Sequence, residues 1–358
     1  MDSARGVTRD IFRSPLSWLL LALPAVILAL FLGWSGGALF LLAGLGIIPL
    51  AKLLGDSTEA LAAHAGPRVG GLLNATMGNA AELIIAIMAV RAGLLDLVKA
   101  SITGSILGNL LLIMGGAVLV GGLRRGTQRF DRTHAGLAAS QMSLALIALA
   151  LPTLFAQAIE PDHHAVELLS DSVALIMLIT YGLFVLHSLR SAEPRREDVH
   201  TGHHWPVRAS LVVLVLSTAA IAWLSEIMVG AVEETTALLG LSEFFIGIII
   251  IPIVGNAAEH FVAITAAAND RMELSMTISL SSSMQIALLV APLLVYGSLL
   301  LGPTQLDLVF TPFEIVALFG ATLITALIAG DGESNWVEGA QLLAVYLITA
   351  MAFFFLPA

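Results

Sequence analysis

Long apolar runs, separated by short polar stretches, make up most of the chain. Each run approaches the ~20 residues that a helix needs to cross a bilayer. The runs are continuous, whereas a membrane barrel shows alternating segments of about ten residues. The pattern therefore predicts an all-α polytopic membrane protein. We predict eleven transmembrane helices, at residues 16–32, 36–54, 68–91, 94–122, 134–154, 166–189, 208–229, 242–268, 273–301, 312–329 and 336–356.

The most polar linker divides the predicted helices into two groups of five. We assign residues 1–35 to an extra N-terminal helix, 36–190 to a first five-helix repeat, 191–207 to a cytoplasmic linker and 208–358 to a second repeat. An odd number of spans per repeat places the second repeat upside down relative to the first. This is the inverted-repeat plan of secondary transporters.

The distribution of Lys and Arg predicts the orientation in the membrane. Cytoplasmic loops carry an excess of these residues. With the N-terminus inside and the C-terminus outside, only Arg91 and Lys99 fall on the outer side. The remaining assigned cations then lie inside: Arg5, Arg9, Arg13, Lys52, Arg68, Arg124, Arg125, Arg129, Arg132, Arg190, Arg195, Arg196, Arg208 and Arg271.

The sequence Gly-Asn-Ala-Ala-Glu occurs twice inside the apolar runs, at Gly78–Glu82 and at Gly255–Glu259. A carboxylate in hydrocarbon is costly unless it is solvated, paired or protonated. Two such carboxylates in identical settings predict a duplicated site that handles charge inside the membrane. In an inverted repeat, Glu82 and Glu259 are expected to meet near the midplane from opposite directions.

The residues around each motif glutamate form a set of hard oxygen ligands. The Asn and the Glu share one helix face, and Gly, with Pro252 before the second copy, can turn backbone carbonyls toward a cavity. Such oxygens suit Ca²⁺ and related cations. Two close carboxylates repel each other, and either a divalent cation or protons relieve that repulsion, so the two should compete. The candidate metal ligands are Glu82, Glu259, Asn79, Asn256, Gly78 and Gly255.

The same motif residues also allow interpretations without transport. The glutamates could be neutral and hydrogen-bonded, and the asparagines could hold neighbouring helices together. His260 follows Glu259, whereas Leu83 follows Glu82, so the two copies differ here. His260 either handles protons beside Glu259 or is a packing residue.

A second repeated pattern places small polar residues one helical turn before an amide. Ser105 precedes Asn109, and Ser281 precedes Gln285. These groups, together with Ser282, either line a cavity or pack polar helix faces. At the membrane faces, acidic side chains either draw cations toward the two mouths or are simply solvated. The candidates are Asp56, Glu59, Glu233 and Glu234.

Composition excludes several functional classes. The chain is 58% hydrophobic and 12% charged, against about 25% charged in soluble domains. It contains no cysteine and has a net charge of −10, so thiol chemistry and a large basic surface for nucleic acid are not expected. No phosphate loop supports ATP-driven pumping, and no nucleophile accompanies the glutamates, so we do not expect an enzyme.

These motifs resemble those of the calcium/proton exchangers, the cation/proton antiporter branch of the calcium–cation antiporter superfamily. The resemblance rests on both motif copies, on His260 after the second, on the Ser281–Ala287 run and on Asp331–Gly339, and it extends from residue 36 to residue 356. It implies an extra helix plus two inverted five-helix repeats. It also implies that Glu82 and Glu259 carry Ca²⁺ and H⁺ alternately.

We therefore predict a secondary antiporter that exports Ca²⁺ in exchange for H⁺ by alternating access, with no cofactor besides the transported ions. A sodium-coupled Ca²⁺ exchanger and a cation channel are the alternatives. His260 and the small number of acidic ligands favour protons over Na⁺. The compact chain without a transit-like leader predicts a prokaryotic plasma membrane protein. Its expected partners are Ca²⁺, protons and the bilayer, without nucleic acid, and its oligomeric state is left open.

Overall fold

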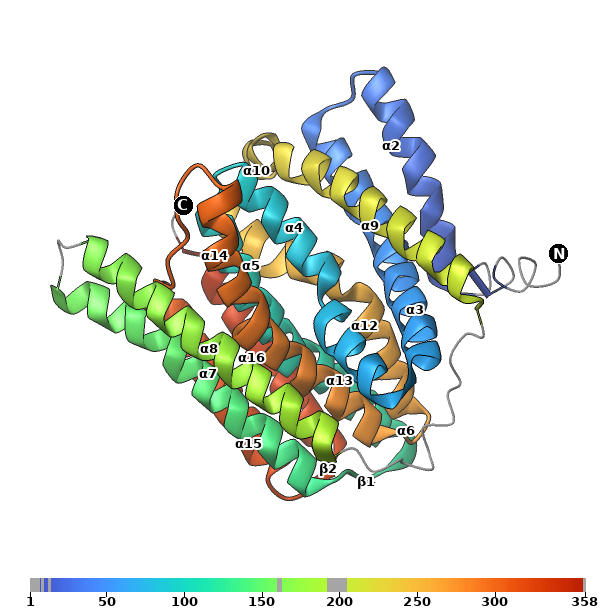
Figure 1. Cartoon of the computed structure of the whole chain (residues 1–358), viewed down its shortest axis with the longest axis vertical. Coiled ribbons are helices and arrows are strands. Elements are labelled where there is room, and N and C mark those ends of the chain that lie inside the picture. Colours follow the sequence, from blue (N-terminus) through green and yellow to red (C-terminus); the bar gives the residue numbers. More distant parts are fainter. Residues whose placement is uncertain (1–6, 8–9, 12–13, 160–162, 192–204, 357–358) are drawn as a thin grey trace. The chain divides into compact units, whose positions relative to one another are not determined.

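The structure, a computed structural model, describes residues 7, 10–11, 14–159, 163–191 and 205–356. These ranges are predominantly helical (Figure 1). The cytoplasmic linker predicted at 191–207 falls mostly on residues 192–204, outside the described part. The same is true of Arg5, Arg9 and Arg13.

The elements of the first half follow one another with short connections. They are η1 (Pro15–Leu21), α2 (Ala22–Phe31), α3 (Gly36–Met77), α4 (Ala80–Arg91), α5 (Leu95–Leu107), η2 (Gly108–Ile113), α6 (Met114–Arg125), β1 (Gln128–Arg129), α7 (Arg132–Ile159) and α8 (His163–Ser191). The first element is a 3₁₀ helix. Its N-cap, Ser14, accepts a hydrogen bond from the Leu16 amide.

The second half contains the remaining elements. They are α9 (Val207–Gly230), α10 (Val232–Leu239), α11 (Glu243–Phe245), η3 (Ile246–Ile250), α12 (Ile251–Ala268), α13 (Met272–Gln285), η4 (Ile286–Val290), α14 (Ala291–Leu301), α15 (Pro312–Ala329), β2 (Glu333–Ser334) and α16 (Trp336–Phe354). The two short strands pair antiparallel, with Gln128 opposite Ser334 and Arg129 opposite Glu333.

Nine helices in the described ranges are long and apolar enough to cross a membrane. The bent pair Val69–Met77 and Ala80–Arg91 makes a tenth if it forms one span, and Pro15–Phe31 is a shorter apolar helix. Each of the eleven predicted segments coincides with one of these elements. The prediction of an all-α integral membrane protein is confirmed, while the number of helices that cross the bilayer stays a prediction.

The second predicted segment is longer in the structure than the sequence indicated. The helix continues past residue 54 and ends at Gly66, whose φ of 82° and ψ of 170° interrupt α3. Glycine tolerates this left-handed region, which costs other residues steric strain. Gly66 therefore separates the second predicted segment from the third.

Among the described residues, three π-helical turns lie within the long helices. The turn η2 contains Asn109, and η4 starts directly after Gln285. The two turns therefore occupy similar positions relative to the repeated polar pattern, which comprises Ser105 with Asn109 and Ser281 with Gln285. The third, η3, precedes Pro252 and leads into α12. Such turns are rare in helices and occur often at functional sites.

The chain contains two compact units, and each draws on both halves of the sequence. One unit comprises the described residues of Met1–Met88, Thr180–Gly240 and Val254–Ala258. In it, α3 packs along α9 and against α2 (Figure 1). Because both units combine elements from the two halves, they do not follow the predicted repeat boundaries, and the division into repeats stays a prediction.

The other unit comprises the described residues of Ala89–Ile179, Leu241–Ile253 and Glu259–Ala358. The continuous helix Leu95–Arg125, formed by α5, η2 and α6, is its central element. It has 72% of its apolar window buried, the largest share among the candidate spans of the described residues. The helix α16 packs along α6, and α15 and α13 pack along α7.

Candidate ion-binding site

The first motif copy lies at a break between two helices. Helix α3 ends at Met77 and α4 begins at Ala80, and the segments on either side differ in direction by 41°. The expected loosening at the motif glycine is therefore present here. Asn79 is buried, with 3% of its surface exposed. Glu82 is partly buried in the first turn of α4, where the helix dipole favours an acidic side chain.

The side chain of Glu82 lies against the second motif copy. A Cβ atom built on Gly255 would be 3.2 Å from Cγ of Glu82, 3.6 Å from its Cδ and 3.7 Å from its Oε1. Glu82 and Gly255 belong to the same compact unit. The structure thus brings together residues from two identical motifs that lie far apart in the sequence.

The second motif copy lies within a continuous helix, α12. Asn256 is buried, with 1% of its surface exposed, and Glu259 follows three residues later. Among the described residues, the Oε2 atom of Glu259 and the Nε2 atom of His260 are buried without a hydrogen-bond partner. A buried oxygen without a hydrogen-bond partner is costly, and a bound cation or proton removes that free-energy cost.

Three residues that the sequence assigned to the site are connected by hydrogen bonds. Nδ2 of Asn109 donates to Oγ of Ser282 at 2.9 Å, and the Ser282 hydroxyl is hydrogen-bonded to the Glu259 carboxyl group. Ser282 and Asn109 are buried, and they come from α13 and η2. Asn109 and Ser282, two of the predicted cavity-lining residues, therefore lie beside a motif glutamate.

The other predicted cavity residues have less defined surroundings. Ser105 is buried on α5, whereas Ser281 and Gln285 are partly buried on α13. Their assignment as cavity-lining groups stays a prediction.

Helix α5 crosses the start of the second motif helix at very short range. A Cβ atom on Gly104 would overlap the carbonyl oxygen of Ile248 in η3 and would lie 2.7 Å from Cγ of Pro252. Proline lacks the amide that would bond to the carbonyl four residues earlier, which is that of Ile248. This carbonyl packs directly onto the Gly104 backbone and joins α5 to the segment that carries Glu259.

Comparison with known proteins now identifies the family. The sodium/calcium exchanger protein family matches residues 35–190 and 209–355, which together make up most of the chain. The chain belongs to the sodium/calcium exchanger family.

Similar proteins cover nearly the full length of this exchanger-family chain. A Ca²⁺/H⁺ antiporter from Aphanothece halophytica is 42% identical over 95% of the chain and 96% of its own length. The Ca²⁺/H⁺ antiporter ChaA of Bacillus subtilis is 39% identical over 93% of the chain and 96% of its length. The crystal structure of the Ca²⁺/H⁺ antiporter protein YfkE superposes with a TM-score of 0.83 at 38% identity, covering 97% of this chain and all of that one.

The acidic residues proposed to draw cations toward the exchanger have mixed surroundings. Asp56 is partly buried and forms an ion pair with Lys52 on the same helix. Glu59, Glu233 and Glu234 are exposed. Glu234 also lies close to Gly36 at the start of α3, where a carboxylate is favoured by the helix dipole. Their role in attracting cations stays a prediction.

A buried carboxylate outside the predicted site residues is Glu314. This residue has 1% of its surface exposed and accepts a hydrogen bond from Oγ1 of Thr103 at 2.8 Å. It forms a capping box with Thr311 at the start of α15. The position of Glu314 just inside an apolar run was a signal in the sequence that this carboxylate has a specific role. Its partner Thr103 could not be recognised, because it is 211 residues away in the sequence.

A third group of polar residues lies at the starts of α7 and α13. Ligand atoms of Asp131, His134 and Glu273 lie within 4.8 Å of one another. Asp131 accepts hydrogen bonds from the backbone amides of His134 and Thr133, and these bonds lower the pKa of its carboxyl group. Since these amides begin α7, the main role visible for Asp131 is that of a helix cap.

Proposed function

We propose that the chain is a secondary active transporter, not an enzyme, and that it exports Ca²⁺ in exchange for H⁺ by alternating access. The approach of the Glu82 side chain to Gly255 carries this proposal, because it joins the acid of one motif copy to the backbone of the other. The activities by which the relatives are known support the same exchange.

In this proposal the two motif glutamates bind Ca²⁺ or protons in turn. Glu259 follows Gly255 by one helical turn on α12, and Glu82 reaches Gly255 from α4. Asn79, Asn256 and the backbone carbonyl of Gly78 supply neutral oxygens, the ligands that suit Ca²⁺, while Gly255, predicted as a further carbonyl ligand, contributes by leaving room for the Glu82 side chain. Ser282 orients the Glu259 carboxyl group, and His260 takes part in proton handling.

Charge balance explains why such a site exchanges ions instead of leaking them. Two carboxylates in a low dielectric repel each other and are costly when neither paired nor protonated. One Ca²⁺ or two protons cancel both charges, so either loaded form is far cheaper than the empty one. The site therefore switches between the two sides of the membrane most readily when it holds Ca²⁺ or two protons. This requirement couples the movement of the two ions.

We further propose that the protein resides in a prokaryotic plasma membrane with its N-terminus in the cytoplasm and its C-terminus outside. The excess of Lys and Arg in the loops then assigned to the inside supports this orientation. The transported ions are the substrates, and the proposal includes no further cofactor.

Purified protein in vesicles with an imposed pH gradient provides the test. The wild type should take up Ca²⁺ when the gradient is imposed, and E82Q and E259Q should abolish uptake while the protein stays folded. An amide keeps the size of the side chain but cannot be ionised. E167Q on α8 removes a partly buried carboxylate outside the motifs and should transport normally.

The same vesicles separate exchange with protons from the two alternatives. Ca²⁺ uptake that is driven by a sodium gradient and does not respond to a pH gradient would show that Na⁺, and not H⁺, is the coupled ion. Single-channel currents far above the turnover of a carrier would indicate a channel. Full transport by both glutamine variants would contradict the assignment of Glu82 and Glu259.

A further inference from the structure

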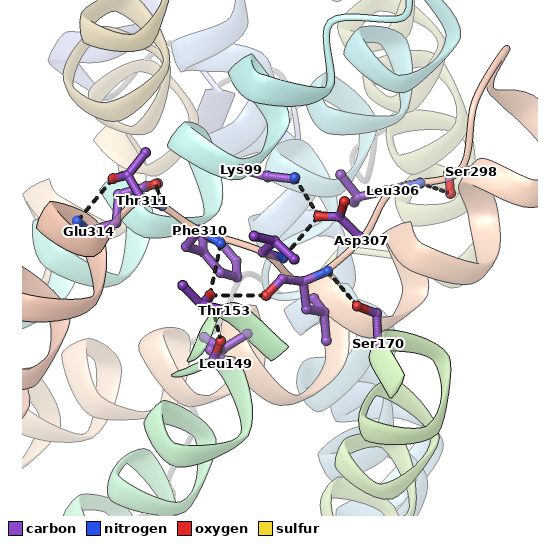
Figure 2. A network of polar contacts seen from close by, with 12 residues as sticks. Lys99, Leu149, Thr153, Ser170, Ser298, Leu306, Asp307, Phe310, Thr311 and Glu314 are labelled. Atoms are coloured by element: carbon purple, nitrogen blue, oxygen red, sulfur yellow. Dashed lines mark hydrogen bonds and ion pairs between the residues drawn. The ribbon is translucent and has the colours of Figure 1, made fainter. Parts of the chain in front are cut away.

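A polar cluster away from the motif copies holds one end of helix α5. Nζ of Lys99 pairs with Oδ1 of Asp307, and one turn later Oγ1 of Thr103 donates to Oε1 of Glu314 at 2.8 Å. Figure 2 shows that the Lys99 and Asp307 side chains point toward each other. Because Lys99 and Thr103 are four residues apart, both contacts lie on one face of α5.

The partner of this face is an extended segment that connects α14 to α15. Its backbone lacks helical hydrogen bonds, and side-chain hydroxyl groups from three helices satisfy it (Figure 2). The accepting groups are Ser298 for the Leu306 amide at 2.8 Å, Ser170 for Leu308 at 3.1 Å and Thr153 for Phe310 at 2.9 Å. Buried backbone amides outside a helix need such partners, so these hydrogen bonds anchor the segment to α14, α8 and α7.

Glu314 connects this anchor to α5 with both carboxyl oxygens. Its Oε2 accepts the Thr311 amide at 2.8 Å, while Oε1 accepts the Thr103 hydroxyl at 2.8 Å. A carboxyl group whose two oxygens both accept hydrogen bonds is held in one orientation. The capping box fixes Glu314 at the start of α15, so the position of the Thr103 hydroxyl is fixed as well.

Other faces of the same central helix lead to Glu259. The Gly104 backbone rests on the Ile248 carbonyl in η3, and Asn109 donates to Ser282, which is bonded to Glu259. Since Leu95–Arg125 is one continuous helix, a shift or rotation at Thr103 also moves Asn109. The Thr103–Glu314 contact therefore sets the position of a group that orients the Glu259 carboxyl.

We propose that Thr103 and Glu314 are positioning residues of the exchange site. By fixing α5 against the start of α15, they hold Asn109 on Ser282 and so keep Glu259 in the orientation that binds Ca²⁺. This inference rests on the proposed function of Glu259. It adds a requirement outside both motif copies, since neither residue touches the ion.

The variant T103V removes the hydroxyl group and keeps the side-chain volume and the capping box of α15. The affinity of a site falls in proportion to the fraction of molecules in the competent arrangement, and we expect that fraction to drop to a tenth to a third. The Kd and the KM for Ca²⁺ should therefore rise by about three- to tenfold, with a smaller change in maximal rate. T103S keeps the hydroxyl and should stay within about twofold of the wild type.

Thr322 provides a matched control on α15. It is a buried threonine whose Oγ1 atom has no hydrogen-bond partner among the described residues. T322V should leave the Kd unchanged. Calorimetric Ca²⁺ titration of purified protein gives the Kd, and uptake in vesicles gives the KM. If T103V folds poorly, T103A can be compared with T103S instead. The Kd for Ca²⁺ should then be larger in T103A than in T103S.

A double variant distinguishes positioning from a general loss of packing. If Thr103 acts through Ser282, T103V should have little further effect on the Kd in an S282A background. An unchanged Kd in T103V, or the same fold increase with and without S282A, would overturn the inference. If T103V weakens Ca²⁺ binding but wild-type uptake ignores the pH gradient, only the proposed function fails.

Discussion

The contact between Glu82 and Gly255 can be tested by adding one methyl group. In G255A the new Cβ would lie 3.2 Å from Cγ of Glu82 and 3.7 Å from its Oε1. Carbon atoms pack best at about 3.5–4.0 Å, so the acidic side chain must move by a few tenths of an ångström. The three atoms nearest to the new methyl group all belong to the flexible Glu82 side chain. Helix α12 should therefore keep its place.

The expected size of the effect follows from this overlap. Crowding a packed site costs about 1–3 kcal/mol, and we take the lower end because Glu82 can rotate. About 1.4 kcal/mol corresponds to a tenfold change in an equilibrium constant, so the KM for Ca²⁺ should rise by about three- to tenfold. Alanine is favoured over glycine inside a helix by about 0.5–1 kcal/mol, which roughly offsets the crowding, so thermal stability should change little.

Two other glycines provide matched comparisons for the same substitution. A Cβ on Gly297 in α14 meets no atom within 4 Å, so G297A should leave the KM unchanged and raise stability slightly. A Cβ on Gly104 overlaps the Ile248 carbonyl, which cannot rotate away. G104A should therefore reduce the amount of folded protein sharply.

Initial rates of Ca²⁺ uptake into vesicles, measured over a range of Ca²⁺ concentrations, give the KM of each variant. Size-exclusion profiles after heating in detergent give the stability. A wild-type KM for G255A would refute the role of the Glu82–Gly255 contact in binding. An equal increase in KM for G297A would show that the effect comes from the helix and not from Glu82.

Two further predictions concern hydroxyl and carboxyl groups. S282A removes the hydrogen bond to Glu259 and should raise the KM for Ca²⁺ several-fold. S283A loses only a hydrogen bond within its own helix and should leave the KM unchanged. Equal KM values in the two variants would contradict the role of Ser282. D131A should lower the stability of the protein at neutral pH by about 1 kcal/mol through the lost helix cap, whereas D131N should lower it far less. Hydrogen bonds lower the pKa of Asp131 in the folded protein. Its contribution to stability is therefore present above the unfolded pKa of about 4 and is lost as the pH falls further. A loss of stability in D131A that becomes larger in acid would be evidence against the cap.

The sequence was sufficient to predict the helices, because their length and apolar character are set by the bilayer. It also predicted Asn109 and Ser282 as cavity-lining residues, and in the structure Nδ2 of Asn109 lies 2.9 Å from Oγ of Ser282, while their role in a site stays a prediction. The kink at Gly66 was missed because a glycine in an apolar run is compatible with a continuous helix. The Thr103–Glu314 contact was missed because the order of residues along the chain does not reveal which helix faces meet.

The two motif copies show why identical letters need not give identical local structure. Gly78 lies at the break between α3 and α4, whereas Gly255 lies inside the continuous helix α12. Inside an α-helix the backbone carbonyls are already bonded to amides four residues on, so Gly255 is poorly placed to offer its carbonyl to an ion. Gly78 at a helix end is better placed, since the last carbonyls of a helix lack such partners. Gly255 contributes instead by lacking a side chain, which allows Glu82 to come close to the second motif.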